Sequence, residues 1–106
     1  MTTLISTILD TCHSINNNRD VKDVFTSLVE EVGELSTEIA ISSGHKKREA
    51  SNDGIVGESI DVIIAVTDIL YLEMKKYGMT SDDIESAMIK RAENKLKKWE
   101  NEVKNK

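Results

Sequence analysis

Apolar residues recur every three or four positions along most of the chain, which is the spacing that one face of an α-helix produces. Four such stretches follow one another, separated by polar or glycine-containing segments. The first stretch covers roughly residues 3–16 and ends in a run of three asparagines. The second begins after Asp20, and Asp23 stands three residues further on, as in a variant of the capping box that starts many helices. The pattern therefore predicts an all-α protein.

The third stretch is the most apolar part of the chain. It begins near Asn52 or Asp53 and stops before Gly78, because glycine is typical of the position just after a helix. Its centre, residues 60–72, is apolar on nearly every side. A helix with that pattern is buried all round. In a chain of 106 residues, we expect a second subunit to cover part of it.

The fourth stretch starts at Thr80 and Asp83, which are spaced like a capping box. Its expected inward face consists of residues at helical spacing, namely Ile84, Ala87, Met88, Ala92, Trp99 and Val103. Segment 44–52, polar and glycine-containing, is interpreted as a mobile loop between the second and third helices. Together these elements predict a single domain over residues 1–106, folded as a four-helix antiparallel bundle that forms a homodimer or homotetramer.

Composition and charge narrow the class of partners. The net charge is -5, and acidic and basic residues are mixed until the lysine-rich C-terminus, so the extended basic face needed by a long nucleic acid is missing. No segment approaches the roughly 20 apolar residues of a membrane span, and the first residues lack a signal-peptide pattern. The single cysteine, Cys12, fits a reducing compartment. We expect a cytoplasmic protein that binds neither membranes nor nucleic-acid polymers.

Two pairs of carboxylates carry the candidate chemistry. Glu31 and Glu34 are three residues apart on the second predicted helix, and Glu58 and Asp61 are three apart on the third. Each pair therefore shares one helix face, where like charges repel unless something neutralises them. Either motif alone is common on solvated helices, but the second pair lies among apolar residues, where a charge is costly unless it is paired or bound to a metal. Two such pairs facing each other would supply the oxygen ligands that Mg²⁺ prefers.

With this order of residues (Glu-Glu-x-x-Glu, a spacer, then Glu-x-x-Asp) the chain resembles the MazG-like all-α nucleoside triphosphate pyrophosphohydrolases. The resemblance extends from about Asp20 to Trp99. It implies a Mg²⁺-dependent enzyme, with Mn²⁺ as a possible substitute, that cleaves a nucleoside or deoxynucleoside triphosphate to the monophosphate and pyrophosphate. Carried over by position, the implied metal ligands are Glu31, Glu34, Glu58 and Asp61.

The last predicted helix supplies candidate substrate-binding residues under the same resemblance. Many relatives carry Asn-x-x-Arg-x-Trp there, and this chain has Asn94, Lys97 and Trp99 at those positions. Lys97 replaces the arginine and would meet a phosphate as a point charge, without bidentate geometry. Lys90 lies on the face of Asn94 and Lys97, and an ordinary solvated lysine face near a helix C-terminus explains Asn94 and Lys97 equally well. Trp99 is interpreted as a core or interface residue.

The implied mechanism needs a group that positions the attacking water, and Glu30 and Glu38 are the nearest candidates, between which the sequence gives little basis for choosing. A phosphoribosyl-ATP pyrophosphatase of the same superfamily is an alternative, although apolar residues 62–66 follow Asp61 where such relatives usually carry a Tyr-His pair. Two further alternatives are a non-catalytic helical dimerisation module and a metal-storage protein.

Other residues with chemical potential have simpler explanations. Asp10 and His13 form one acid-x-x-His pair, whereas a di-iron bundle requires two, so His13 is interpreted as structural or surface. His45 belongs to a charged segment that is interpreted as solvated. Cys12 has no nearby basic residue in the sequence that would lower its pKa. Asp68 is either a support for the carboxylate pairs or a polar residue at an interface.

Overall fold

The computed structural model describes residues 2–15, 17–44 and 53–105. Within these ranges the chain forms helices and no strand, which confirms the all-α prediction for this part of the chain. The helices are α1 (Leu4–Ser14), α2 (Val21–Ser42), α3 (Gly54–Lys75) and α4 (Ser81–Lys104). Of the predicted loop 44–52 only Gly44 is described, so that prediction and His45 lie outside the described residues. No helix in the described ranges is long and apolar enough to cross a membrane.

Local hydrogen bonds define the ends of most of these helices. Thr3, Asp20 and Thr80 each accept a hydrogen bond from the backbone N–H three residues on, and the side chain there accepts one from the backbone of the cap. Both capping boxes predicted from the sequence are therefore confirmed. Asp53 precedes α3 without such a bond. Gly78 follows α3 with a φ of 75°, in the left-handed region that favours glycine.

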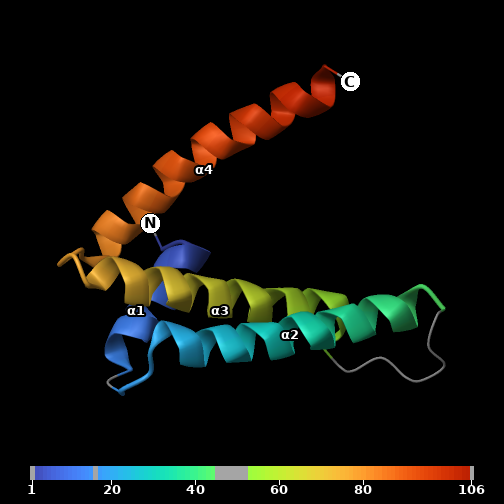
Figure 1. Cartoon of the computed structure of the whole chain (residues 1–106), viewed down its shortest axis with the longest axis horizontal. Coiled ribbons are helices and arrows are strands. Elements are labelled where there is room, and N and C mark those ends of the chain that lie inside the picture. The colour runs from blue at the N-terminus through green and yellow to red at the C-terminus, as the bar shows by residue number, and fades with distance from the viewer. Residues whose placement is uncertain (1, 16, 45–52, 106) are drawn as a thin grey trace.

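Helices α2 and α3 lie antiparallel and side by side, and α1 and the first turns of α4 pack against the C-terminal part of α3 (Figure 1). The buried core gathers at that end of the molecule. It consists of Ile8, Leu9 and Cys12 of α1, Val24 of α2, Tyr71 and Leu72 of α3, and Ile84 of α4. His13 of α1 borders the same region, with Nδ1 3.2 Å from the Tyr71 hydroxyl, which agrees with a structural role.

The predicted inward face of α4 is correct only for the first turns. Ile84 is fully buried and Met88 packs against the core. Every described residue from 89 to 105 is exposed, because this part of α4 projects away from the other helices (Figure 1). Within one chain Trp99 is 64% exposed, so of the two interpretations given for it, core or interface, the core of the single chain is excluded and the interface stays a prediction.

The centre of α3 is only partly covered within one chain. Ile60, Ile63, Ile64 and Val66 are between 36% and 44% exposed in the single chain. One chain by itself therefore does not bury this helix all round, and its covering by a second subunit stays a prediction. Helix α2 covers one side of α3, and α1 reaches only its later turns, so the earlier turns keep an open apolar side.

Candidate metal centre

The four predicted carboxylates lie together between α2 and α3. Oxygens of Glu31, Glu34 and Glu58 all lie within 4.8 Å of one another, and so do oxygens of Asp53, Glu58 and Asp61. Glu58 belongs to both groups and joins them. The antiparallel packing of α2 and α3 is what brings the pair on one helix opposite the pair on the other.

Burial differs among these carboxylates in a way that suits cation binding. Glu58 is 8% exposed, Glu31 and Asp61 are half-buried, and Glu34 is exposed. One buried oxygen of Glu31 and one of Glu58 accept no hydrogen bond from the described residues. Buried polar atoms are almost always paired, so two unpaired carboxylate oxygens in one cluster require an explanation. A divalent cation that coordinates both would provide it.

The electrostatics of the cluster also favour a bound cation. Burial, together with the neighbouring carboxylates of Glu34, Asp61 and Glu31, raises the pKa of Glu58 to about 7. Burial likewise raises the pKa of Glu31, with added repulsion from Glu34 and Asp61. The negative charge at this site is therefore unfavourable in the protein alone. A bound divalent ion reverses that balance, because it makes the ionised carboxylates the favoured form.

Asp53 is a candidate ligand that the sequence analysis missed. It precedes α3, and its carboxylate folds back towards Glu58 and Asp61. Gly57 leaves room for this side chain, because a Cβ at residue 57 would overlap the Cβ and Cγ of Asp53. In the sequence, the only sign of this arrangement is a glycine four residues after an aspartate at a helix start. That sign indicates a ligand only once the direction of the Asp53 side chain is known.

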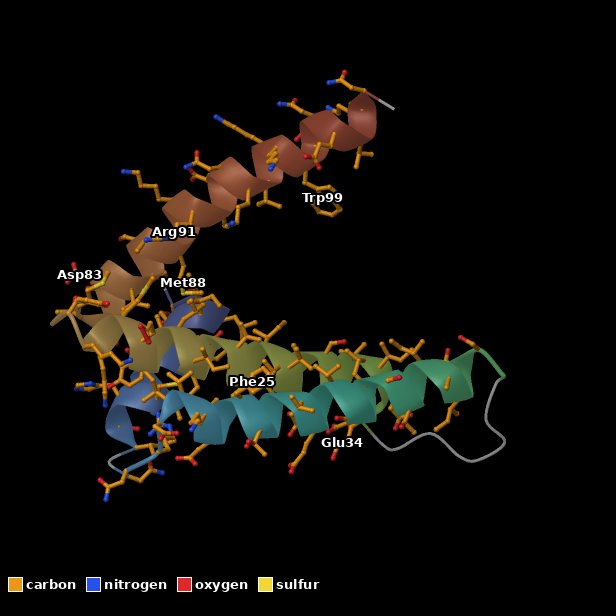
Figure 2. All side chains as sticks on the ribbon, viewed as in Figure 1. Phe25, Glu34, Asp83, Met88, Arg91 and Trp99 are labelled. Atoms are coloured by element: carbon orange, nitrogen blue, oxygen red, sulfur yellow. The ribbon has the colours of Figure 1, made fainter. Side chains whose placement is uncertain are left out.

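The remaining predicted site residues are not gathered around the carboxylates in the single chain. Lys90, Asn94 and Lys97 are exposed on the projecting part of α4, which has no contact with α2 among the described residues. Figure 2 shows this separation, with Glu34 on α2 and Trp99 on the projecting helix.

The two candidates for positioning the attacking water differ in their exposure to solvent. Glu30 is exposed, whereas Glu38 is buried on α2.

An ion pair near the carboxylates was also missed. Arg19, in the connection between α1 and α2, donates from Nε and Nη2 to the two carboxylate oxygens of Asp68 at 2.8 and 2.7 Å. Both side chains are 15% exposed. Burial acts to raise the pKa of Asp68, but hydrogen bonds from Arg19 and Cys12 lower it overall. This pair explains why a charged Asp68 is tolerated in the apolar helix α3.

Cys12 has the properties of an unreactive thiol. Burial, with Asp68 beside it, raises the pKa of Cys12 to about 11. Since the thiolate is the nucleophile, a raised pKa argues against covalent catalysis by this residue.

Paired carboxylates facing each other from two antiparallel helices define a candidate site for divalent cations. Comparison of the chain with protein-family models, with curated proteins and with solved structures gives no match.

Proposed function

We propose that this protein is a Mg²⁺-dependent nucleoside triphosphate pyrophosphohydrolase, with Mn²⁺ as an alternative metal. The observation that supports this most is the carboxylate cluster, in which Glu31 and Glu58 each hold a buried oxygen without a hydrogen-bond donor among the described residues. Mg²⁺ binds such oxygens and commonly keeps positions for water and substrate phosphates. The MazG-like order of the four carboxylates supports the same reaction.

The reaction would break the α–β phosphoanhydride bond by addition of water, which releases a nucleoside monophosphate and pyrophosphate. Bound Mg²⁺ would neutralise the triphosphate and lower the pKa of the attacking water. Glu31, Glu34, Glu58 and Asp61 would hold the metal, and Asp53 would assist from the start of α3. Glu38 is the better candidate to position the water, because it is buried and lies on the side of α2 that carries Glu31. Glu30 is exposed and lies about 100° away around the helix axis.

The active form is proposed to be a homodimer or homotetramer. Exposed apolar residues on three helices support this, among them Phe25, Val29 and Val32 of α2, Ile60 and Ile63 of α3, and Leu96, Trp99 and Val103 of α4. In an assembly the projecting part of α4 would carry Lys90, Asn94 and Lys97 towards the carboxylates of another copy. That arrangement would give these residues the substrate-binding role that a single chain does not allow.

The test is pyrophosphate release by the purified full chain with Mg²⁺, across ribo- and deoxyribonucleoside triphosphates and phosphoribosyl-ATP. We expect release that falls at least about 10²-fold in Asp61→Asn, because a lost metal ligand removes most charge stabilisation of the transition state. Asp10→Asn, an exposed change on α1, is the matched control and should keep full activity. No release from any nucleotide by the folded protein would refute the proposal.

A non-catalytic dimerisation module is the second candidate, favoured by the exposed apolar residues named above. Metal dependence separates the two. Millimolar Mg²⁺ should raise the melting temperature of the proposed enzyme, since a ligand that binds only the folded state stabilises it. If the protein is only a dimerisation module, Mg²⁺ should raise the melting temperature of the unmodified chain no more than that of the Asp61→Asn variant.

A further inference from the structure

A cavity of about 320 Å³ adjoins the carboxylate cluster. Glu31 and Asp61 belong to both, and the cavity is also lined by Arg19 and Asp68. Asp61 and Asp68 are seven residues apart on one side of α3, which corresponds to about 10 Å along the helix axis. The cavity therefore extends along α2 and α3 from the carboxylates towards the connection between α1 and α2. Its volume is at the lower end of the range for ligand pockets, about 300–1,000 Å³.

The walls of the cavity are partly apolar. Val24 of α2 and Ile64 and Ala65 of α3 line it with apolar atoms, and Ser27 is an exposed residue on its α2 side. Apolar walls with a few polar groups are typical of small-molecule sites.

The end of the cavity away from the carboxylate cluster presents hydrogen-bond acceptors. Arg19 has no free donor there, because its five N–H groups are taken up by the two Asp68 oxygens, the carbonyls of Cys12 and Ile15, and the side chain of Asn17. Asp68 retains some acceptor capacity, since a carboxylate has about four acceptor positions, of which Arg19 uses one on each oxygen and the Cys12 thiol uses another.

Asp23 adds to this acceptor surface. It lines the cavity, and of its two carboxylate oxygens Oδ2 accepts from the backbone of Asp20. An ionised carboxylate cannot donate a hydrogen bond. At this end of the cavity a hydrogen-bond donor is therefore favoured over a carbonyl oxygen, which would lie near the carboxylates of Asp68 and Asp23.

We infer that this cavity binds the nucleoside part of the substrate and prefers a base that carries an exocyclic amino group. The inference rests on the proposed function, because the carboxylate cluster would hold the phosphates at the other end. Cytosine and uracil test it well, since they have nearly the same shape and differ only at two neighbouring positions. The exocyclic amino donor of cytosine is replaced by a carbonyl acceptor in uracil, and the ring nitrogen N3 beside it changes from an acceptor to an N–H donor.

The experiment measures binding of CMP and UMP to the full chain by calorimetry with Mg²⁺. We expect CMP to bind at least about tenfold more tightly, which is the factor that one hydrogen bond to a charged group supplies. Ser27→Leu, which places a larger side chain at the cavity, should weaken CMP binding by a similar factor. Thr26→Leu is the matched control, because Thr26 is exposed on α2 and does not line the cavity.

Equal binding of CMP and UMP, binding of neither, or unchanged CMP binding in Ser27→Leu would overturn the inference. Pyrophosphate release from CTP and UTP is measured in parallel to separate it from the proposed function. Release from both at equal kcat/KM would keep the enzyme and remove the base preference. Tight CMP binding without release from any triphosphate would keep the nucleoside site and remove the enzyme.

Discussion

At the scale of single residues, the carboxylate cluster combines features that are unfavourable for a protein without a ligand. Glu58 is buried among other acids, and an oxygen of Glu31 lies beside it without a donor among the described residues. Gly57 replaces a better helix former so that Asp53 can approach. Each feature costs stability and favours cation binding, which is the usual relation between stability and function at a site.

Gly57→Ala tests the link between Gly57 and Asp53. The added Cβ would overlap the Cβ of Asp53, which a side-chain rotation cannot move, so the backbone at the start of α3 has to shift. We expect weaker Mn²⁺ binding and no gain in the free energy of unfolding of the metal-free protein, because this shift offsets the helix propensity of alanine, which is worth about 1 kcal/mol. Calorimetry and thermal unfolding measure the two quantities. Gly33→Ala is the matched control, because a Cβ there meets nothing within 4 Å. Equal Mn²⁺ affinity in both variants would contradict the role of Asp53.

The raised pKa of Glu58 predicts how stability depends on pH. The folded protein holds this proton up to about pH 7, whereas a glutamate in the unfolded chain loses it near the ordinary pKa of 4.5. The folded state therefore binds more protons between these values, so the free energy of unfolding of the metal-free protein should fall as the pH rises from about 5 to about 8. Urea unfolding in the presence of a chelator measures this.

The control for that pH series is Glu58→Gln, which removes the titrating group and should flatten the curve. Saturating Mg²⁺ should oppose the fall in the free energy of unfolding. Carboxylates bind a metal in their deprotonated form, so the affinity of the cluster for Mg²⁺ rises with pH. A pH slope that is the same in Glu58→Gln would show that the cause lies elsewhere.

At the scale of elements, α2 and α3 form the frame of the site, and Arg19 attaches the α1–α2 connection to that frame. Its partner Asp68 lies 49 residues further along the chain. The same guanidinium also bonds to the backbone carbonyls of Cys12 and Ile15 at the end of α1. One side chain therefore fixes the positions of α1, the connection and α3 relative to one another.

Arg19→Met tests this role. It leaves the Asp68 carboxylate largely buried without its cation, which should lower the free energy of unfolding by about 3 kcal/mol. Lys76→Met is the matched control, because it breaks an ion pair with Glu73 whose side chains are 60% and 50% exposed. That change should cost at most about 1 kcal/mol. Urea unfolding of both variants gives the comparison, and equal losses would argue against a structural function for the buried pair.

At the scale of the whole molecule, one chain is more extended than its length requires. The radius of gyration is 16.4 Å, whereas a compact domain of this length has about 13 Å. The projecting part of α4 accounts for the difference (Figure 1). In Figure 2 the Trp99 ring is turned towards the other helices. An extended helix with exposed apolar residues on it favours assembly with further copies.

Trp99 reports on that assembly, because it is the only tryptophan in the chain. In an oligomer that covers α4, the fluorescence emission of Trp99 should lie at shorter wavelength than that of a solvent-exposed tryptophan. Dilution should shift the emission back to longer wavelength at the concentration where sedimentation shows dissociation to the monomer. Leu96→Glu should favour the monomer by placing a charge in the interface, whereas Lys95→Glu should leave assembly unchanged. A monomer at every concentration, with solvent-exposed Trp99 emission, would contradict the oligomer.

The sequence by itself determined the features that depend on neighbours within a few residues. The starts of α2 and α4 follow from the caps at Asp20 and Thr80, and the shared face of each carboxylate pair follows from its spacing of three, because these relations are set inside one helical turn. The four carboxylates were therefore predictable as two pairs, whereas their meeting in one cluster depends on the packing of α2 against α3.

Only the tertiary structure decided which distant groups meet. Asp53 joins Glu58 through the direction of a side chain at a helix start, and Arg19 reaches Asp68 across 49 residues. The course of α4 was not predictable either, because an apolar stripe shows that a face needs covering but does not show whether the same chain covers it. Ile84 is covered within the chain and Trp99 is not, since packing against α1 and α3 ends after the first turns of α4.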